Sequence, residues 1–242
     1  MHSLIHGAAL AGGLAQGLSG TGFGMITVPV LSLLLGPKAV PPIILLITSV
    51  INLSMLLMLR RHVQWKRSMP LAVGGLLGVP LGTVVLLFMP AAGLKILIGV
   101  AVAGTALLML AGVRWPIRNE RAALFPVGFA SGMLSGSIMV GGPPVILFLQ
   151  NQQWDKTAFR ANIMLLWNVQ AMTAYVTYFA AGLITRSAGM AALALAPAML
   201  IGLLSGFWLH HRLPEARFSQ FVLALALISG SMALYSGIIA SL

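Results

Sequence analysis

The chain has 242 residues, of which 59% are hydrophobic and 7% are charged, and its formal net charge is +11. Soluble domains carry about 25% charged residues, so this composition excludes a soluble globular domain and predicts an integral membrane protein. The chain has no cysteine, which excludes a disulfide framework and a thiolate metal site. Its Lys and Arg lie in short loops between apolar runs, which favours cytoplasmic retention of those loops over binding of nucleic acid.

Charged residues divide the chain into long uncharged runs that are apolar throughout, a pattern of membrane helices and not of alternating β-strands. A helix crosses the hydrocarbon core with about 20 residues. Two runs, 1–37 and 122–154, are too long for one crossing. The other six predict transmembrane helices at residues 39–59, 69–88, 92–112, 158–182, 188–209 and 216–241.

Glycine and proline interrupt both overlong runs. The first contains GLSGTGFGMITVPV and the second contains SGSIMVGGPPVILF. In a helix interior glycine costs about 1 kcal/mol and proline about 3 kcal/mol relative to alanine, so neither run forms one continuous helix. Half-helices of roughly 12 to 15 residues reach only about 20 Å, short of the hydrocarbon thickness of about 30 Å. We therefore predict re-entrant helical hairpins at residues 4–35 and 122–149.

The hairpins and the spans that follow them indicate an internal duplication. The matches are Gly13 with Gly128, Gly17 with Gly132 and Pro29 with Pro144 at an offset of 115 residues, Asn52 with Asn168 at 116, and Gly78 with Gly202 and Gly82 with Gly206 at 124. The duplication predicts a first repeat at 1–113, a linker at 114–121 and a second repeat at 122–242. Each repeat holds one hairpin and three transmembrane helices, which gives eight hydrophobic segments.

The distribution of Lys and Arg indicates the topology. If both broken segments cross the membrane, the two sides carry eight and six Lys/Arg; if both are hairpins, one side carries eleven and the other only Lys38, Lys95 and Arg186. Because these residues collect on the cytoplasmic side, we predict hairpins, a cytoplasmic linker and both termini outside the cytoplasm. An odd number of crossings per repeat inverts the second repeat relative to the first, an architecture typical of transporters.

The hairpin tips are the predicted ligand site. Broken helices at membrane depth expose backbone groups that a cavity or protein must meet, and the start of a half-helix presents N–H groups and a partial positive charge that suit an anion. The candidate ligand-binding residues are Gly20, Thr21, Gly22 and Gly24 at the first tip, Ser135, Gly136, Ser137, Gly141 and Gly142 at the second, and Thr48, Asn52 and Asn168 on the spans. Interhelical hydrogen bonding is an equal alternative for the three span residues, and tight helix packing is the preferred explanation for Gly13, Gly17, Gly128 and Gly132.

The acidic residues are only Glu120, Asp155 and Glu215, and all three fall in predicted loops. Cation transporters usually keep carboxylates within the membrane, and an enzyme needs acid–base or nucleophilic groups there. We therefore expect an anion or a neutral solute as the substrate, no enzymatic activity, no metal and no cofactor. Proton coupling would use Asp155, a histidine or the protonation of the substrate itself. Arg160 lies about one turn inside its span and is either an anion contact or a snorkelling anchor.

Four motifs carry a resemblance to a known family: GLSGTGFGMITVPVL, SGSIMVGGPPVILFL, GGLLGVPLG, and IGLLSGFWLHHRL before the final apolar span. Together they resemble the TauE/SafE sulfite exporter family of bacterial inner-membrane permeases, over nearly the whole chain. The resemblance implies a multi-pass protein of the bacterial inner membrane that exports or takes up sulfite, sulfoacetate or another organosulfonate, driven by an ion gradient. The Lys and Arg distribution places its termini in the periplasm. The family commonly has three glycines at the first tip, where this chain has Gly22, Phe23 and Gly24, so the substrate can differ accordingly.

Several alternatives stay open at this point. The same composition suits a passive small-anion channel, a transporter of another small organic anion, or a non-transporting assembly subunit. The expected partners are the anion substrate and membrane lipid, without nucleic acid, and a homodimer is one candidate for the oligomeric state. The sequence does not fix the direction of transport, the exact substrate or the coupling ion.

Overall fold

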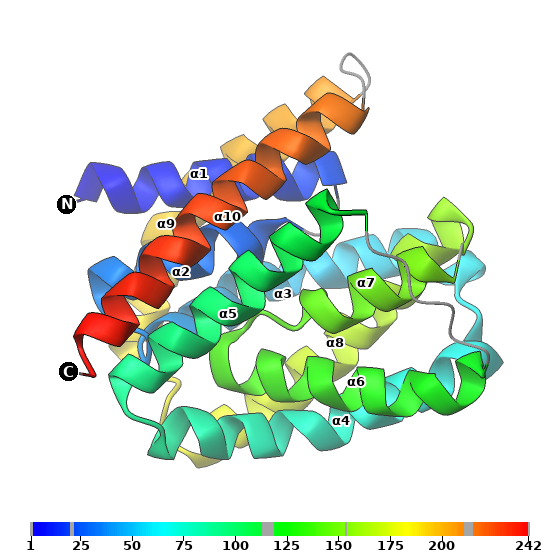
Figure 1. The fold of residues 1–242 in the computed structure, drawn as a ribbon, viewed down its shortest axis with the longest axis horizontal. Coiled ribbons are helices and arrows are strands. Elements are labelled where there is room, and N and C mark those ends of the chain that lie inside the picture. Colours follow the sequence, from blue (N-terminus) through cyan, green and yellow to red (C-terminus); the bar gives the residue numbers. More distant parts are fainter. Residues whose placement is uncertain (1, 20–21, 113–118, 153, 211–214, 242) are drawn as a thin grey trace. The chain divides into compact units, whose positions relative to one another are not determined.

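The structure is a computed structural model, and it describes residues 2–19, 22–112, 119–152, 154–210 and 215–241. Across these residues the chain is helical without any strand, which confirms the all-helical prediction. The helices are α1 (His2–Ser19), α2 (Phe23–Leu35), α3 (Val40–Leu59), the short 3-10 helix η1 (Arg60–His62), α4 (Trp65–Phe88), α5 (Ala91–Leu110), α6 (Glu120–Ile138), α7 (Gly142–Asn151), α8 (Lys156–Ala180), α9 (Arg186–His210) and α10 (Glu215–Ile239) (Figure 1).

Five helices in the described part of the chain are long and apolar enough to cross a membrane. They are α3 together with η1, α4, α5, α9, and residues Val222–Ile239 of α10. Each coincides with one of the six predicted spans. The sixth span coincides with α8, which has 25 residues but carries Asn162, Asn168, Gln170 and Thr173 along its length. α8 is therefore the most polar of the predicted spans, and a multi-pass membrane protein is supported by the other five.

The chain divides into two compact units that are discontinuous in sequence. The first unit comprises Met1–Ile44, Met89–Val113 and Arg186–Leu242, and the second comprises Leu45–Phe88 and Arg114–Thr185. The first unit therefore contains α1, α2, the first turn of α3, α5, α9 and α10. The second contains the rest of α3, η1, α4, α6, α7 and α8. The units differ from the two halves of the sequence because each hairpin packs with a helix from the other half.

In the first unit, α1 and α2 form an antiparallel hairpin. The Phe23 N–H at the start of α2 donates to Gln16 Oε1 at 3.2 Å, and Thr27 Oγ1 donates to the Ala8 carbonyl at 3.3 Å. Gln16 thus supplies an acceptor to a helix terminus whose first N–H groups have no partner within the helix. These two bonds fix the two arms of the hairpin against each other.

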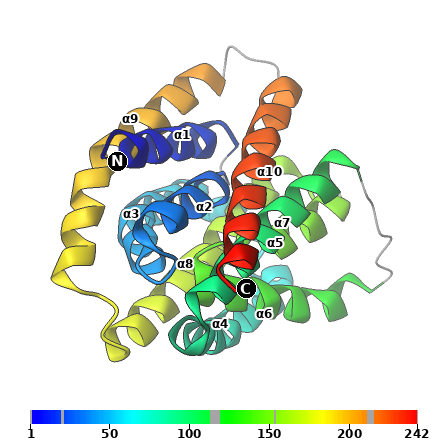
Figure 2. The ribbon, with the colours of Figure 1, turned by 60° about the vertical axis from the view of Figure 1, so that its left-hand side comes forward.

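The α1 arm packs parallel to α9, and Figure 2 shows the two helices side by side. A Cβ atom on Gly13 would overlap with the Met199 carbonyl oxygen, and one on Gly17 would overlap with the Leu203 carbonyl oxygen. Glycine is needed at both positions because the opposing atoms are backbone atoms, which no side-chain rotation can move away. The predicted packing role of Gly13 and Gly17 is confirmed.

Helices α5 and α10 pack antiparallel in the same unit (Figure 2). Gly99 lies against Leu234, and Gly230 lies against Ala103, so the numbering rises along one helix as it falls along the other. Small residues at the contact let the two helices approach closely, which is the usual means of association in a membrane.

In the second unit, α4 and α6 run parallel in close contact (Figure 1). Glycines of each helix oppose backbone carbonyl groups of the other. Along α4 the contacts are Gly74 with Phe125, Gly78 with Phe129 and Gly82 with Met133; along α6 they are Gly128 with Leu71, Gly132 with Gly75 and Gly136 with Val79. The packing role predicted for Gly128 and Gly132 is confirmed, and Gly136, a predicted tip residue, takes part in the same contact.

Candidate functional site

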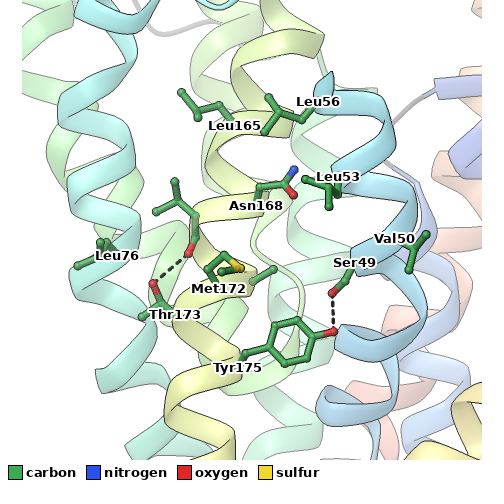
Figure 3. A pocket seen from close by; sticks show the side chains of 12 residues that line it. Ser49, Val50, Leu53, Leu56, Leu76, Leu165, Asn168, Met172, Thr173 and Tyr175 are labelled. Atoms are coloured by element: carbon green, nitrogen blue, oxygen red, sulfur yellow. Dashed lines mark hydrogen bonds between the residues drawn. The ribbon is translucent and has the colours of Figure 1, made fainter. Parts of the chain in front are cut away.

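A cavity of about 640 Å³ lies between α3 and α8 in the second unit, with one wall residue from α4 (Figure 3). Its wall is mostly apolar. The lining residues are Ser49, Val50, Leu53, Leu56, Leu76, Leu165, Asn168, Val169, Ala171, Met172, Thr173 and Tyr175. Val50 is 71% exposed and Met172 is 69% exposed, so the cavity opens on the apolar outer surface of these helices.

The polar groups of this cavity already bond to one another and to backbone. Tyr175 donates its hydroxyl proton to Ser49 Oγ at 3.0 Å, and Ser49 Oγ donates to the Leu45 carbonyl (Figure 3). Thr173 Oγ1 donates to the Val169 carbonyl at 2.9 Å. Each hydroxyl has only one proton, so these three groups keep acceptor positions and no free donor.

Asn168 holds α3 and α8 together. Its Nδ2 donates to the Asn52 carbonyl at 3.0 Å and to the Met164 carbonyl at 2.8 Å, so both amide protons are used. The interhelical role that the sequence allows for Asn168 is therefore present in the structure. Thr48 and Asn52 lie on the same helix, α3, half-buried and buried respectively. A ligand contact from these three residues stays a prediction.

The tip of the second hairpin is the turn between α6 and α7. Met139 adopts a left-handed conformation with φ 57° and ψ 29°, and its N–H donates to the Ser135 carbonyl at 3.0 Å. It is the one non-glycine residue with positive φ in the described part of the chain, a conformation that L-residues seldom adopt. Val140 and Gly141 follow, and α7 then begins at Gly142. The turn brings Ser135, Gly141 and Gly142, all predicted site residues, to one buried tip.

A chain of buried hydrogen bonds joins this tip to α8. Ser131 Oγ donates to the Gly141 carbonyl at 2.6 Å, and Gln170 Nε2 donates to Ser131 Oγ at 2.9 Å. Farther along α8, Tyr178 donates its hydroxyl proton to the Gly136 carbonyl at 2.8 Å. The face of α8 that carries Gln170 and Tyr178 thus holds the tip, whereas Asn168 and Tyr175 face the cavity.

Gln170 also has an acceptor without a partner. Its side chain is 1% exposed, and its Oε1 is the one buried side-chain polar atom without a hydrogen-bond partner among the described residues. A buried acceptor without a donor costs about 1–3 kcal/mol. A ligand or an ordered water that carries a donor would remove this cost.

The first hairpin tip is only partly within the described residues. Gly20 and Thr21 lie outside them. Gly22 is buried and directly precedes α2, and Gly24 is half-buried in the first turn of that helix. Ser137, the remaining predicted residue, is buried in the last turn of α6, where its hydroxyl donates to the Met133 carbonyl at 2.7 Å.

A charged cluster lies where α4 and α6 begin. Arg67 Nε and Nη2 each donate to Glu120 at 2.6 Å, the Arg67 guanidinium lies 4.1 Å from the centre of the Trp154 ring, and Trp154 Nε1 donates to Glu120 at 3.1 Å. The hydrogen bond from Arg67 lowers the pKa of Glu120 below its usual value, and this effect exceeds the opposing effect of burial. Half-buried Arg160 lies near the start of α8, where the Asp155 carboxylate caps the helix by accepting from the N–H groups of Thr157 and Ala158.

Reasoning from the sequence does not single out Ser131, Gln170, Tyr175 or Tyr178 as site residues. The sequence does contain a pattern in the α8 segment that points to these residues. Asn168, Gln170, Tyr175 and Tyr178 place a polar group on nearly every turn of a predicted membrane span, and polar residues within spans mark function or interhelical bonding.

Comparison with known proteins identifies the family. A family model described as sulfite exporter TauE/SafE matches residues 5–233, which is nearly the whole chain. No curated protein and no solved structure matches the chain. A match of this extent agrees with the motifs at both hairpins and with the apolar helices between them. This chain belongs to the sulfite exporter TauE/SafE family of membrane transporters.

Proposed function

We propose that this protein is a secondary transporter that moves a small sulfur-containing oxyanion, such as sulfite, sulfoacetate or another organosulfonate, across the bacterial inner membrane. Membership of the family supports export of such an anion. The five long apolar helices support a multi-pass protein. An anion is favoured over a cation because none of the three acidic residues falls within a predicted span.

The second hairpin tip is the observation that carries this proposal. Val140 and Gly141 are buried between α6 and α7, and within the described residues their N–H groups donate to no acceptor. Buried N–H groups are nearly always paired in native proteins, so two consecutive unpaired donors favour a ligand that supplies acceptors. α7 begins at Gly142, and the positive end of its dipole adds to the attraction for an anion. Pro143 and Pro144 have no N–H, which concentrates the donors at the tip.

The cavity between α3 and α8 is a weaker candidate for the anion. The hydroxyl protons of Ser49, Thr173 and Tyr175 and the amide protons of Asn168 are already donated to other groups. An oxyanion requires donors, and this wall offers mainly apolar surface and acceptors. We therefore assign the anion to the tip.

The helix pairings support two inverted repeats, each with a re-entrant hairpin and three transmembrane helices. Helices α5 and α10 occupy the same place in the two sequence halves and run antiparallel. Helices α3 and α8 also correspond, and they run antiparallel because Ser49 bonds to Tyr175 while the Asn52 carbonyl bonds to Asn168. A twofold axis in the membrane plane relates corresponding helices in this way. The first hairpin arm of each half packs against the second span of the other half: α1 against α9, and α6 against α4.

The lengths of the second hairpin arms, α2 and α7, support re-entrant segments and periplasmic termini. The first arms, α1 and α6, have 18 and 19 residues and are longer than the half-helices predicted from the sequence. α2 has 13 residues and α7 has 10, which at 1.5 Å per residue gives about 20 Å and 15 Å, short of a hydrocarbon core of about 30 Å. With two hairpins that do not cross, six crossings place both termini on the side that carries fewer Lys and Arg. Participation of the first tip, through Gly20, Thr21, Gly22 and Gly24, stays a prediction.

Transport by purified protein in proteoliposomes tests the proposal. Uptake of labelled sulfite is measured with methanesulfonate, sulfoacetate, sulfate and acetate as competitors, with and without a pH gradient. We expect saturable uptake and counterflow of a sulfur oxyanion. Flux without counterflow would indicate a passive channel, and a lack of flux for every anion would contradict the proposed function.

A glycine variant of the tip links this transport to the site. A Cβ atom on Gly141 would lie 2.9 Å from the Ser131 carbonyl oxygen and 3.0 Å from both Gln170 Oε1 and Ser135 Cβ, so Gly141→Ala must shift the tip. Gly104→Ala on α5 is the matched control because nothing lies within 4 Å of its Cβ position. We expect Gly141→Ala to lose at least tenfold in sulfite uptake, an effect of about 1.4 kcal/mol. Equal uptake by the two variants would contradict the assignment of the anion to this tip.

A further inference from the structure

The orientation of the Gln170 amide is fixed by its neighbours. Ser131 has one hydroxyl proton and donates it to the Gly141 carbonyl, so Ser131 Oγ can only accept from Gln170. Gln170 must therefore present Nε2 to Ser131, as it does at 2.9 Å. Reversal of the amide would require the Ser131 proton for Gln170 and would leave the buried Gly141 carbonyl without that donor. The amide oxygen of Gln170 is thus held away from Ser131 as an acceptor.

This acceptor lies beside the donors of the tip. The Cβ position of Gly141 is 3.0 Å from Gln170 Oε1, and the unpaired N–H groups of Val140 and Gly141 belong to the same turn. Gln170 Oε1 has no partner and is buried. One buried turn therefore combines two donors and one acceptor that the protein itself does not satisfy.

A monoprotonated oxyanion matches this combination. Its ionised oxygens accept from the two N–H groups, and its hydroxyl group donates to Gln170 Oε1. A fully ionised oxyanion would place a negatively charged oxygen against the lone pairs of the amide oxygen, which is unfavourable in a site of low dielectric. On the basis of the proposed function, we infer that Gln170 Oε1 accepts the hydroxyl proton of the bound anion and selects a monoprotonated oxyanion. Among the proposed substrates this favours hydrogen sulfite over organosulfonates, whose sulfonate group has no hydroxyl.

Other titratable and charged groups around the tip do not supply this proton. Tyr178 on α8 uses its hydroxyl proton for the Gly136 carbonyl, and Tyr175 donates on the cavity side of α8. Arg67, Glu120 and Arg160 lie near the opposite ends of α4, α6 and α8. The substrate thus carries its own proton, which couples transport to a pH gradient without a carboxylate in the membrane.

Binding measured against pH tests this inference. Purified full-length protein in lipid nanodiscs is titrated with sulfite by calorimetry at pH values on both sides of the second ionisation of sulfurous acid. The apparent affinity for total sulfite should fall about tenfold per pH unit above that ionisation, because only the protonated fraction binds. An affinity that does not change with pH would overturn the inference.

The variant Gln170→Met separates the hydrogen bond from the charge of the ligand. It should bind sulfite about tenfold more weakly at low pH and lose the preference for the protonated form, since one hydrogen bond to a charged ligand is lost. Methanesulfonate has one negative charge and no hydroxyl group to donate to Gln170, so Gln170→Met should bind it no more weakly than wild type does. A pH dependence that persists in Gln170→Met would overturn the inference, because charge alone would then explain it.

The control variant is Gln220→Met, at an exposed glutamine of α10. It should bind sulfite as wild type does, and the unfolding midpoints of both variants verify that each is folded. If wild type binds no sulfur oxyanion at any pH, the proposed function fails. If it binds sulfite with the same affinity at every pH, the proposed function stands and the role of Gln170 fails.

Discussion

The parallel contact between α4 and α6 makes a strong prediction for Gly78. A Cβ atom there would overlap with the Phe129 carbonyl oxygen and would lie 2.8 Å from Met133 N and 3.0 Å from Gly132 Cα. Ordinary Cβ contacts begin at 3.4 Å. All three neighbours are backbone atoms, so Gly78→Ala requires the helices to separate by about 1 Å.

The cost of this separation follows from three contributions. Overpacking of a close contact costs about 1–3 kcal/mol, and the weak Cα–H···O contacts of closely packed helices are worth about 0.5–1 kcal/mol each. Replacing glycine by alanine within a helix regains about 1 kcal/mol of helix propensity. We therefore expect Gly78→Ala to lose about 1–3 kcal/mol of unfolding free energy. Gly104→Ala, which meets no atom within 4 Å, should gain up to about 1 kcal/mol.

Equilibrium unfolding of the purified variants in detergent measures both values. The comparison uses the difference between Gly78→Ala and Gly104→Ala, because helix propensity contributes equally to both. If the two variants unfold at the same denaturant concentration, α4 and α6 are not in the close contact described above.

Three further changes test other parts of the site. Glu120→Gln removes a carboxylate whose pKa is lowered chiefly by the hydrogen bond from Arg67. The stabilisation by this carboxylate is present above the usual carboxyl pKa and is lost as the pH falls through the lowered pKa, so the variant should be about 1 kcal/mol less stable than wild type at neutral pH and equal to it in acid. Thermal unfolding that shows the same difference at every pH would refute this. Tyr178→Phe leaves the Gly136 carbonyl without its buried donor and should cost about 1–2 kcal/mol in denaturant unfolding, whereas unchanged stability would argue against that bond. Ser131→Ala removes the two hydrogen bonds of the Ser131 hydroxyl, to the Gly141 carbonyl and from Gln170 Nε2. It should speed hydrogen exchange of the amides of α7, and exchange at the wild-type rate would show that these two bonds do not hold the tip.

The sequence predicts the helices well because membrane helices depend on length and apolarity alone. The run after Lys38 predicts a helix at 39–59, and α3 occupies Val40–Leu59. The first tip is predicted between two half-helices, and α1 ends at Ser19 while α2 begins at Phe23. Breaks of this kind are visible in sequence because glycine and proline are costly within a helix.

The register of the duplication is harder to predict. The predicted offset of 115 residues pairs Gly13 with Gly128, whereas the helix contacts place Gly13 and Gly132, 119 residues apart, in similar surroundings. Gly13 opposes Met199 of α9, and Gly132 opposes Gly75 of α4. Met199 and Gly75 are 124 residues apart, which is the offset that also pairs Gly78 with Gly202. The two offsets differ by four residues, about one helical turn, and glycines spaced by four satisfy both. Only contacts with a second helix distinguish them.

The hydrogen bonds of the tip could not be predicted from the sequence. Ser131 and Gln170 are 39 residues apart, and their bond depends on the packing of α6 against α8. The sequence indicates that Gln170 is a polar residue in an apolar span, but it does not show which of its amide atoms lacks a partner. That information depends on the carbonyl of Gly141, which takes the Ser131 proton.

Anomalous diffraction from crystals soaked in selenite, the selenium analogue of sulfite, tests the central claim most directly. The account predicts a selenium peak at the tip between α6 and α7, with oxygen atoms within hydrogen-bond distance of the Val140 and Gly141 N–H groups and of Gln170 Oε1. A selenium peak in the cavity between α3 and α8, with the tip empty, would contradict it.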